Sequence, residues 1–256
     1  KEYRRQRQMC IRDRRYELID EELFPFLNGD DEVIKELQEK DLSIANQSDY
    51  IWKYGHYPVY HNTDVAFYAD ASQGLEAQLA ELKKAEKYIF MEYFIVERGI
   101  MWNAVLDILK EKVKEGVEVR VMYDGMCSIL LLPYKYPKEL KKYGIKAKMF
   151  APIVPFLSTT QNNRDHRKIV VIDGKVAFTG GVNLADEYIN QVERFGHWKD
   201  VAVKITGDAV RSFTVMFLQM WNVSEKGTEN YEAYLKDIVY EEPLYHDGFV
   251  IPYGET

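Results

Sequence analysis

The 256-residue chain has few cysteines and no excess of positive charge, and each shortage excludes a class of protein. Its two cysteines, Cys10 and Cys127, lie far apart and provide neither a disulfide framework nor a metal-binding spacing, which fits a reducing compartment. The net charge is −7, so the chain lacks the global basic field of many nucleic-acid-binding proteins. No run of 18 apolar residues occurs, so no segment of this sequence has the composition of a membrane-spanning helix. An anionic substrate would therefore need a local binding site.

The remaining composition is that of a soluble globular protein with a sizeable core, either one large α/β domain or two small ones. Hydrophobic periodicity predicts strands and helices that alternate along the chain, with helices covering a mixed or largely parallel central sheet. The predicted strands are 65–68, 88–96, 117–123, 147–150, 169–172, 176–179 and 201–205. The predicted helices include one marked by Val33, Ile34 and Leu37, one marked by Leu75, Leu79 and Leu82, and those at 101–115, 137–143 and 209–221.

The first residues are basic and poor in apolar side chains, which predicts a solvated tail over residues 1–20. Within it, Met9-Cys10-Ile11-Arg12-Asp13-Arg14 resembles a translated sequencing-adapter fragment, so residues 1–15 carry no functional argument. The predicted division is an N-terminal tail and lead-in at 1–58, one catalytic domain at 59–225 and a C-terminal segment at 226–256.

One motif of fixed spacing stands out, H-x-K-x4-D-x6-G-G-x-N, and it occurs once, from His166 to Asn183. A histidine and a lysine two residues apart in an extended segment point to the same side, which places a nucleophile beside a positive charge. The glycine pair Gly180-Gly181 permits a close approach of backbone to a ligand, and Asn183 adds a neutral donor. These groups can hold a phosphodiester and attack it without a metal, so the motif predicts phosphoryl chemistry.

The motif and its surroundings resemble the phospholipase D superfamily, and within it most closely the N-terminal catalytic half of bacterial cardiolipin synthases. The likeness covers roughly residues 60–222. It is carried by Asn162 to Gly174 and extends through Phe90 to Phe94, Tyr123-Asp124-Gly125, Phe178 to Tyr188 and Trp198-Lys199-Asp200. The resemblance implies a phospholipase D-like α/β domain and a reaction that needs no metal, nucleotide or other cofactor.

The resemblance also implies residue roles. His166, as neutral imidazole, would attack phosphorus and form a phosphohistidine. Lys168 and Asn183 would hold the non-bridging oxygens. An acidic residue would orient the His166 ring, and Asp200 is the first choice, ahead of Glu187 and Glu193.

The remaining site residues leave alternatives open. Asp173 is placed with the catalytic set, although shaping the turn before Gly174 is favoured over proton transfer. Gly180, Gly181, Glu92 and Asp124 are placed with the substrate-binding set. For Asp124 a functional role and a structural turn are equally favoured, and for Glu92 a buried, hydrogen-bonded carboxylate is favoured.

Two loops, 128–136 and 151–164, are rich in apolar residues. They are expected either to form a lip that admits acyl chains or contacts a bilayer, or to pack against their own domain, and the two readings carry equal weight.

The implied activity is transfer of a phosphatidyl group between two phosphatidylglycerol molecules to give cardiolipin. The alternatives are a phospholipase D or nuclease that uses water, and a non-catalytic lipid-binding half. Enzymes of the superfamily combine two such motifs, whereas this sequence contains one. We therefore expect a second motif beyond Thr256, or from a homodimer in trans. The implied location is the cytoplasmic face of a bacterial membrane, with the membrane-spanning segments outside this sequence, and nucleic acid is not an expected partner.

Overall fold

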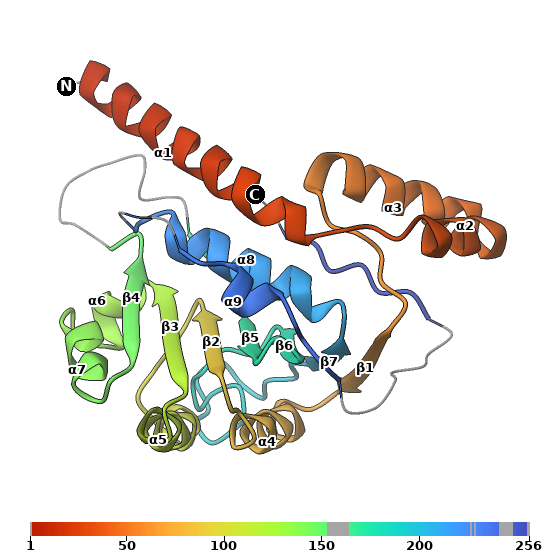
Figure 1. Cartoon of the computed structure of the whole chain (residues 1–256). Coiled ribbons are helices and arrows are strands. Elements are labelled where there is room, and N and C mark those ends of the chain that lie inside the picture. The colour runs from red at the N-terminus through yellow and green to blue at the C-terminus, as the bar shows by residue number, and fades with distance from the viewer. Residues whose placement is uncertain (1, 153–163, 226, 228, 241–247, 255–256) are drawn as a thin grey trace. The chain divides into compact units, whose positions relative to one another are not determined.

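The computed structural model describes residues 2–152, 164–225, 227, 229–240 and 248–254, although not the side chains of residues 2–12, 128 and 130 (Figure 1). By internal contacts the chain divides into two units. The first combines Lys1–Asp64 with Thr206–Thr256, and the second is Val65–Ile205. The second unit contains every described residue of the motif.

Helices and strands alternate through the second unit, as the periodicity predicts. The helices in the described chain are α1 Glu2–Leu23, η1 Phe24–Phe26, α2 Asp31–Lys40, α3 Leu42–Gly55, α4 Ala71–Leu82, α5 Ile100–Lys114, α6 Cys127–Leu130, α7 Tyr136–Lys142, α8 Val210–Asn222 and α9 Glu232–Leu235. The strands are β1 Thr63–Tyr68, β2 Tyr88–Tyr93, β3 Glu118–Asp124, β4 Lys146–Phe150, β5 Ile169–Ile172, β6 Val176–Gly180 and β7 Ala202–Gly207. The α/β fold is confirmed.

These strands form one sheet in the order β1-β7-β6-β5-β2-β3-β4. β2 pairs in parallel with β3, and β3 with β4, whereas β5 runs antiparallel to both β2 and β6, so the sheet is mixed. Asp173-Gly174, a sequence typical of hairpin turns, joins β5 to the antiparallel β6. Every residue of β5 is buried, because the strand lies between two neighbours in the middle of the sheet.

Strand direction determines where the site lies. β2 and β3 end at one edge of the sheet, and β5 begins at that edge because it runs antiparallel to β2. The residues just before β5 therefore lie beside those just after β2. We call this the catalytic edge, and the end with the Asp173-Gly174 turn the turn edge.

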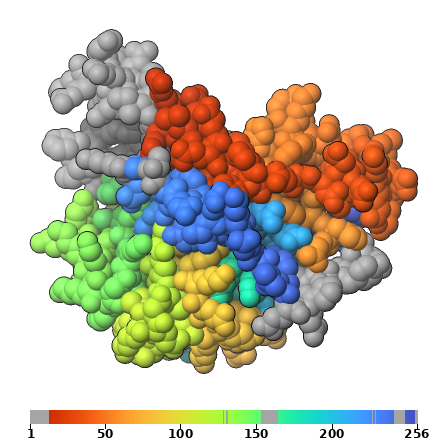
Figure 2. Space-filling model, viewed as in Figure 1, coloured from red at the N-terminus to blue at the C-terminus, as the bar shows by residue number. Residues whose placement is uncertain are grey.

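The main core of the second unit lies between the sheet and α4 and α5. The buried face of α5 contributes Met101, Trp102, Val105 and Leu109, all at most 1% exposed, against Ile89 and neighbouring strand residues. The side chains of the gold to green part of this unit fill the spaces between the ribbons on the face shown in Figure 2.

The predicted strand over 88–96 is too long, because β2 ends at Tyr93. Two backbone N–H groups that follow bind side chains instead of a neighbouring strand. Ile95 donates to Asn183 Oδ1 at 2.9 Å, and Val96 donates to Cys127 Sγ at 3.3 Å. The chain leaves the sheet at the catalytic edge for this reason.

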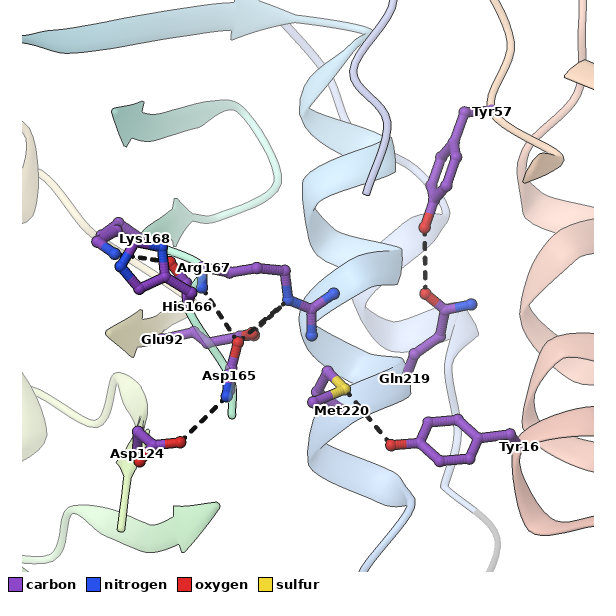
Figure 3. A network of polar contacts seen from close by, with 10 residues as sticks. All are labelled: Tyr16, Tyr57, Glu92, Asp124, Asp165, His166, Arg167, Lys168, Gln219 and Met220. Carbon is purple, nitrogen blue, oxygen red and sulfur yellow. Dashed lines mark hydrogen bonds and ion pairs between the residues drawn. The ribbon is translucent and has the colours of Figure 1, made fainter. Parts of the chain in front are cut away.

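The segment predicted as a solvated tail, residues 1–20, is helical, because α1 extends from Glu2 to Leu23. Ile19 and Leu23 are buried, and Tyr16 Oη lies 3.7 Å from Met220 Sδ on α8, which belongs to the same unit (Figure 3). The sequence did not predict this packing, because the few apolar residues stand among many charged ones. None of the described helices is both long and apolar enough to cross a bilayer.

Candidate active site

The sequence His166-Arg167-Lys168 is extended and leads directly into β5. Figure 3 shows His166 and Lys168 together on one side of the chain and Arg167 on the other, the arrangement that their spacing predicts. Tyr93 is the position opposite Lys168 when the β2–β5 register, in which Glu92 faces Ile169, is continued by one residue. The candidate nucleophile and cation thus share one side of the catalytic edge.

His166 is exposed, and its ring lies 4.8 Å from the ring of Phe94, measured between centroids. Partial burial lowers the pKa of His166 below its ordinary value, and the positive charge of Lys168 lowers it further. The carboxylates of Asp165 and Asp124 act in the opposite direction without reversing the shift. The ring is therefore neutral at neutral pH, which is the form that can act as a nucleophile.

Lys168 is buried, and its Nζ donates a hydrogen bond to the backbone carbonyl of His166 at 2.6 Å. The same atom lies 5.4 Å from the ring centroid of Phe94, within range of a cation–π contact. Burial lowers the pKa of Lys168 to about 8, against the opposing influence of Asp165 and Asp200. The motif therefore holds a partly desolvated cation next to the exposed imidazole.

Asn183 is buried, and both ends of its amide are engaged by protein groups. Its Oδ1 accepts from Ile95 N, and its Nδ2 donates to Tyr188 Oη at 2.7 Å. At most one N–H is left for a substrate oxygen. The predicted oxygen-binding role of Asn183 stays a prediction, while its role in fixing the chain after β2 is seen directly.

The glycine pair makes room for another part of the chain, whereas the sequence suggested room for a ligand. A Cβ on Gly180, whose φ is +146°, would lie 2.4 Å from the carbonyl oxygen of Val201. A Cβ on Gly181 would lie 2.1 Å from Asp200 Oδ1. The absence of both Cβ atoms allows the segment that starts at Asp200 to approach the motif.

Asp200 therefore reaches the catalytic edge, and its charge acts on Lys168. Its Oδ1 accepts from the backbone N–H of Val201 at 2.8 Å. Within the described part of the chain, no hydrogen bond joins Asp200 to the His166 ring, so its predicted orienting role stays a prediction. Of the two alternatives, Glu187 is paired with Arg194 at 3.2 Å, and Glu193 is exposed.

Asp173 lies at the turn edge, five residues along the chain from Lys168, or about 16 Å at the usual strand rise. Its carboxylate accepts three backbone N–H groups, from Glu86, Lys87 and Tyr88, each at 2.8 Å. β5 separates Asp173 from His166, so its placement with the catalytic set stays a prediction. Its contacts are those of the structural alternative, since they hold the start of β2 against the hairpin.

The buried carboxylates of Glu92 and Asp165 form a charged cluster with the partly exposed Arg167, on the other side of the chain from His166 (Figure 3). Arg167 Nε donates to Glu92 Oε1 at 2.7 Å and lies 3.4 Å from Asp165 Oδ1. Burial raises the pKa of Glu92 well above its usual range, and the charge of Arg167 opposes that rise. Glu92 is thus a buried, hydrogen-bonded carboxylate, the favoured alternative, and lies on the side of the chain opposite His166.

Asp124 ends β3 and is fully buried. Its Oδ2 accepts from Asp165 N at 3.0 Å, while its Oδ1 accepts from Met126 N at 2.8 Å and from Arg164 at 3.2 Å. Burial raises the pKa of Asp124, and these donors counteract the rise. The structural alternative describes these contacts, because the carboxylate fixes the chain just before His166.

Two contributors were missed from the sequence. Phe94, which provides the ring beside His166 and Lys168, follows β2, and only the β2–β5 register reveals its place. Asp165 directly precedes His166 in the sequence, and its acidic side chain was the available signal.

The apolar loops give a divided result. In the loop at 128–136, Leu132 and Tyr136 are buried in their own unit, whereas Ile129 and Tyr134 are exposed. The loop at 151–164 lies mostly outside the described residues.

The described residues contain no candidate metal site, since no three or more side chains of histidine, cysteine, aspartate or glutamate are grouped so that they could hold a metal ion.

The family model described as "Cardiolipin synthase, PLD-like domain" matches residues 79–221, more than half of the chain. The chain belongs to this family of phospholipase D-like domains. The match contains the complete motif, from His166 to Asn183.

An uncharacterized protein of Streptococcus mutans is 50% identical over 232 residues, which are 91% of this chain and 50% of the relative. A cardiolipin synthase of Alkalihalophilus pseudofirmus is 40% identical over 184 residues, which are 72% of this chain and 36% of that enzyme. The chain thus spans half or less of the length of these relatives.

Among solved structures, the phosphatidylserine synthase of Haemophilus influenzae aligns with a TM-score of 0.52 and 16% identity, over 72% of this chain and 44% of that protein. At this identity the likeness shows the fold alone. The cardiolipin synthase-like domain suggests a phosphoryl-transfer enzyme.

Proposed function

We propose that this domain transfers a phosphatidyl group from one phosphatidylglycerol to another, through a phosphohistidine at His166. The observation that carries the proposal is the pair at the catalytic edge: an exposed, neutral imidazole beside the buried ammonium group of Lys168. This pair combines a nucleophile with a positive charge that can stabilise developing phosphoryl charge.

In the first step, a ring nitrogen of His166 forms a bond to phosphorus, and the bond from phosphorus to the glycerol head-group oxygen breaks. The leaving oxygen takes a proton from an acid and departs as glycerol. Lys168 offsets the negative charge on the non-bridging oxygens. Asp200 is the proposed acceptor for the other ring nitrogen, since it lies close enough for its charge to act on Lys168.

In the second step, a hydroxyl group of another phosphatidylglycerol attacks the phosphorus and loses its proton to a base. The bond between phosphorus and nitrogen breaks, His166 is restored, and cardiolipin is released. If water took the place of that hydroxyl group, the product would be phosphatidic acid.

The acid and base require a second histidine of the same type. We propose that it comes from a second motif in the same polypeptide or from a second copy of this chain. The family match and the shared length with the relatives support a two-motif enzyme acting at the surface of a bacterial membrane.

The test is product analysis by mass spectrometry after incubation of the chain with phosphatidylglycerol vesicles. Formation of cardiolipin that is abolished by His166→Ala supports the proposal, with His197→Ala as the control because His197 is also exposed. Formation of phosphatidic acid without cardiolipin would show that the chain is a hydrolase, which would contradict the proposed transferase activity. Light scattering on the same samples distinguishes a dimer from a monomer. Binding of the vesicles without any turnover by a dimer would support the non-catalytic alternative.

A further inference from the structure

A small cavity of about 20 Å³ lies beside Lys168, on the side of the sheet covered by α4. Its lining includes Lys168, Gln78, Tyr93 and Thr179, and apolar side chains complete the wall. A site needs roughly 10–15 Å³ and two to four polar partners to hold one water molecule. This cavity has both the volume and the polar groups, and it is too small for a phosphate.

The Gln78 side chain has an unused hydrogen-bond donor at this cavity. The residue is 6% exposed, and its Oε1 accepts a hydrogen bond from Tyr93 Oη at 3.1 Å. Its Nε2 is buried and has no hydrogen-bond partner in the described chain. An unsatisfied buried amide N–H is costly, so a partner in the cavity is expected.

The close packing of α4 brings Gln78 to this position. One turn earlier in the helix, a Cβ on Gly74 would lie 2.6 Å from Cβ of Ala202 on β7. Because Gly74 has no side chain, α4 can approach the sheet closely enough for Gln78 to line the cavity beside Lys168.

We propose that one ordered water molecule occupies this cavity and that Gln78, through this water, is a positioning residue for Lys168. The water accepts hydrogen bonds from Gln78 Nε2 and Lys168 Nζ, and donates to the hydroxyl group of Thr179. Lys168 Nζ has three N–H donors, of which the His166 carbonyl takes one, so a further donor is available for the water. The water thereby solvates a buried cation and holds it on the His166 side.

Four other titratable groups surround Lys168 and must be separated from this effect. Asp165 and Asp200 raise its pKa, and its charge acts on His166. Tyr93 is buried and its pKa is raised, so it is neutral in the same range. None of these four is altered in the variants below.

The experiment measures the titration of Lys168 in the whole chain by NMR, with lysine labelled at the side-chain ε carbon and the signal assigned by its loss in Lys168→Arg. In the unaltered chain the midpoint of the Lys168 titration is expected at about pH 8. Gln78→Leu should lower it by about one pH unit, because the solvating water is lost. Gln78→Glu should raise it by about the same amount, because a carboxylate then faces the cation through the water. Gln73→Leu is the matched control, since Gln73 is exposed on the same helix.

An unchanged midpoint in folded Gln78→Leu would overturn the proposal. If that variant does not fold, Gln78→Glu and Thr179→Val decide instead, and the absence of a shift in both would overturn it. The role of the water in catalysis rests on the proposed function, but the titration does not. A shifted midpoint in a dimeric chain that shows no lipid turnover would remove the proposed function and keep the water site.

Discussion

The two ends of β5 carry charged residues of the same motif and use them in opposite ways. At the catalytic edge, His166 is exposed and Lys168 retains unused donors beside it. At the turn edge, the carboxylate of Asp173 is engaged by three backbone N–H groups. A short spacing pattern thus places an exposed imidazole and a buried cation at one end of a buried strand and a fully engaged carboxylate at the other.

From this contrast we predict that a motif residue need not belong to the reaction. Residues at the catalytic edge should affect rate far more than stability, and residues at the turn edge the reverse. Four predictions separate the two ends, in order of decreasing effect.

Lys168→Met should slow phosphatidyl transfer by about 10²- to 10³-fold, because the charge that stabilises the transition state is removed. The free energy of unfolding should not fall, since a buried cation is replaced by an apolar side chain. Lys175→Met, beyond the turn edge, is the matched control and should leave the rate unchanged. Equal losses in the two variants would remove the distinction between the ends.

Gly181→Ala should slow transfer by about 10²-fold, because a Cβ at this position would displace the carboxylate of Asp200 by about an ångström. Gly248→Ala, where a Cβ would meet no atom within 4 Å, is the control. A wild-type rate in Gly181→Ala would show that the position of Asp200 does not matter for the reaction.

The transfer rate should fall at both acidic and alkaline pH. His166 must be neutral, and because its pKa is lowered, activity should persist until the pH falls below the ordinary histidine range. Lys168 must be charged, so the rate should fall about tenfold per pH unit above about 8. Lys168→Arg should remove this alkaline decline, because arginine stays protonated. A profile without an alkaline decline in the unaltered protein would contradict the role of Lys168.

Asp173→Ala should lower the free energy of unfolding by about 2 kcal/mol, because three hydrogen bonds to a carboxylate are lost. The transfer rate of the folded variant should change less than about threefold, since the site lies at the other end of the strand. Urea denaturation measures the free energy of unfolding. The transfer rate is measured without urea, at a temperature below the thermal unfolding midpoint of the variant. Asp107→Ala, at an exposed i,i+3 pair, is the control and should cost less than about 1 kcal/mol. A large rate loss with normal stability would return Asp173 to the catalytic set.

Much of the fold could be predicted because local signals agreed with the global structure. The apolar run Ile169 to Ile172 predicts a central strand, and Asp173-Gly174 predicts the hairpin after it. The spacing of His166 and Lys168 also fixes their common side, since alternation along an extended chain needs no knowledge of neighbours.

What failed depended on contacts between distant segments. The end of β2 at Tyr93 follows from side chains at Asn183 and Cys127 that bind the next N–H groups. Glycine is needed at position 181 because the Asp200 carboxylate lies where a Cβ would be. The position of Gln78 beside the cavity depends on how closely α4 packs against the sheet. Such contacts leave no periodic signal in the sequence.

The most direct test of the central claim is mass spectrometry of the peptide that contains His166, after the chain is incubated with phosphatidylglycerol vesicles and quenched at alkaline pH. A phosphatidyl adduct on His166 is predicted, absent in His166→Ala and present in Asp173→Asn. An adduct on another residue, or one that survives His166→Ala, would contradict the assignment of His166 as the nucleophile.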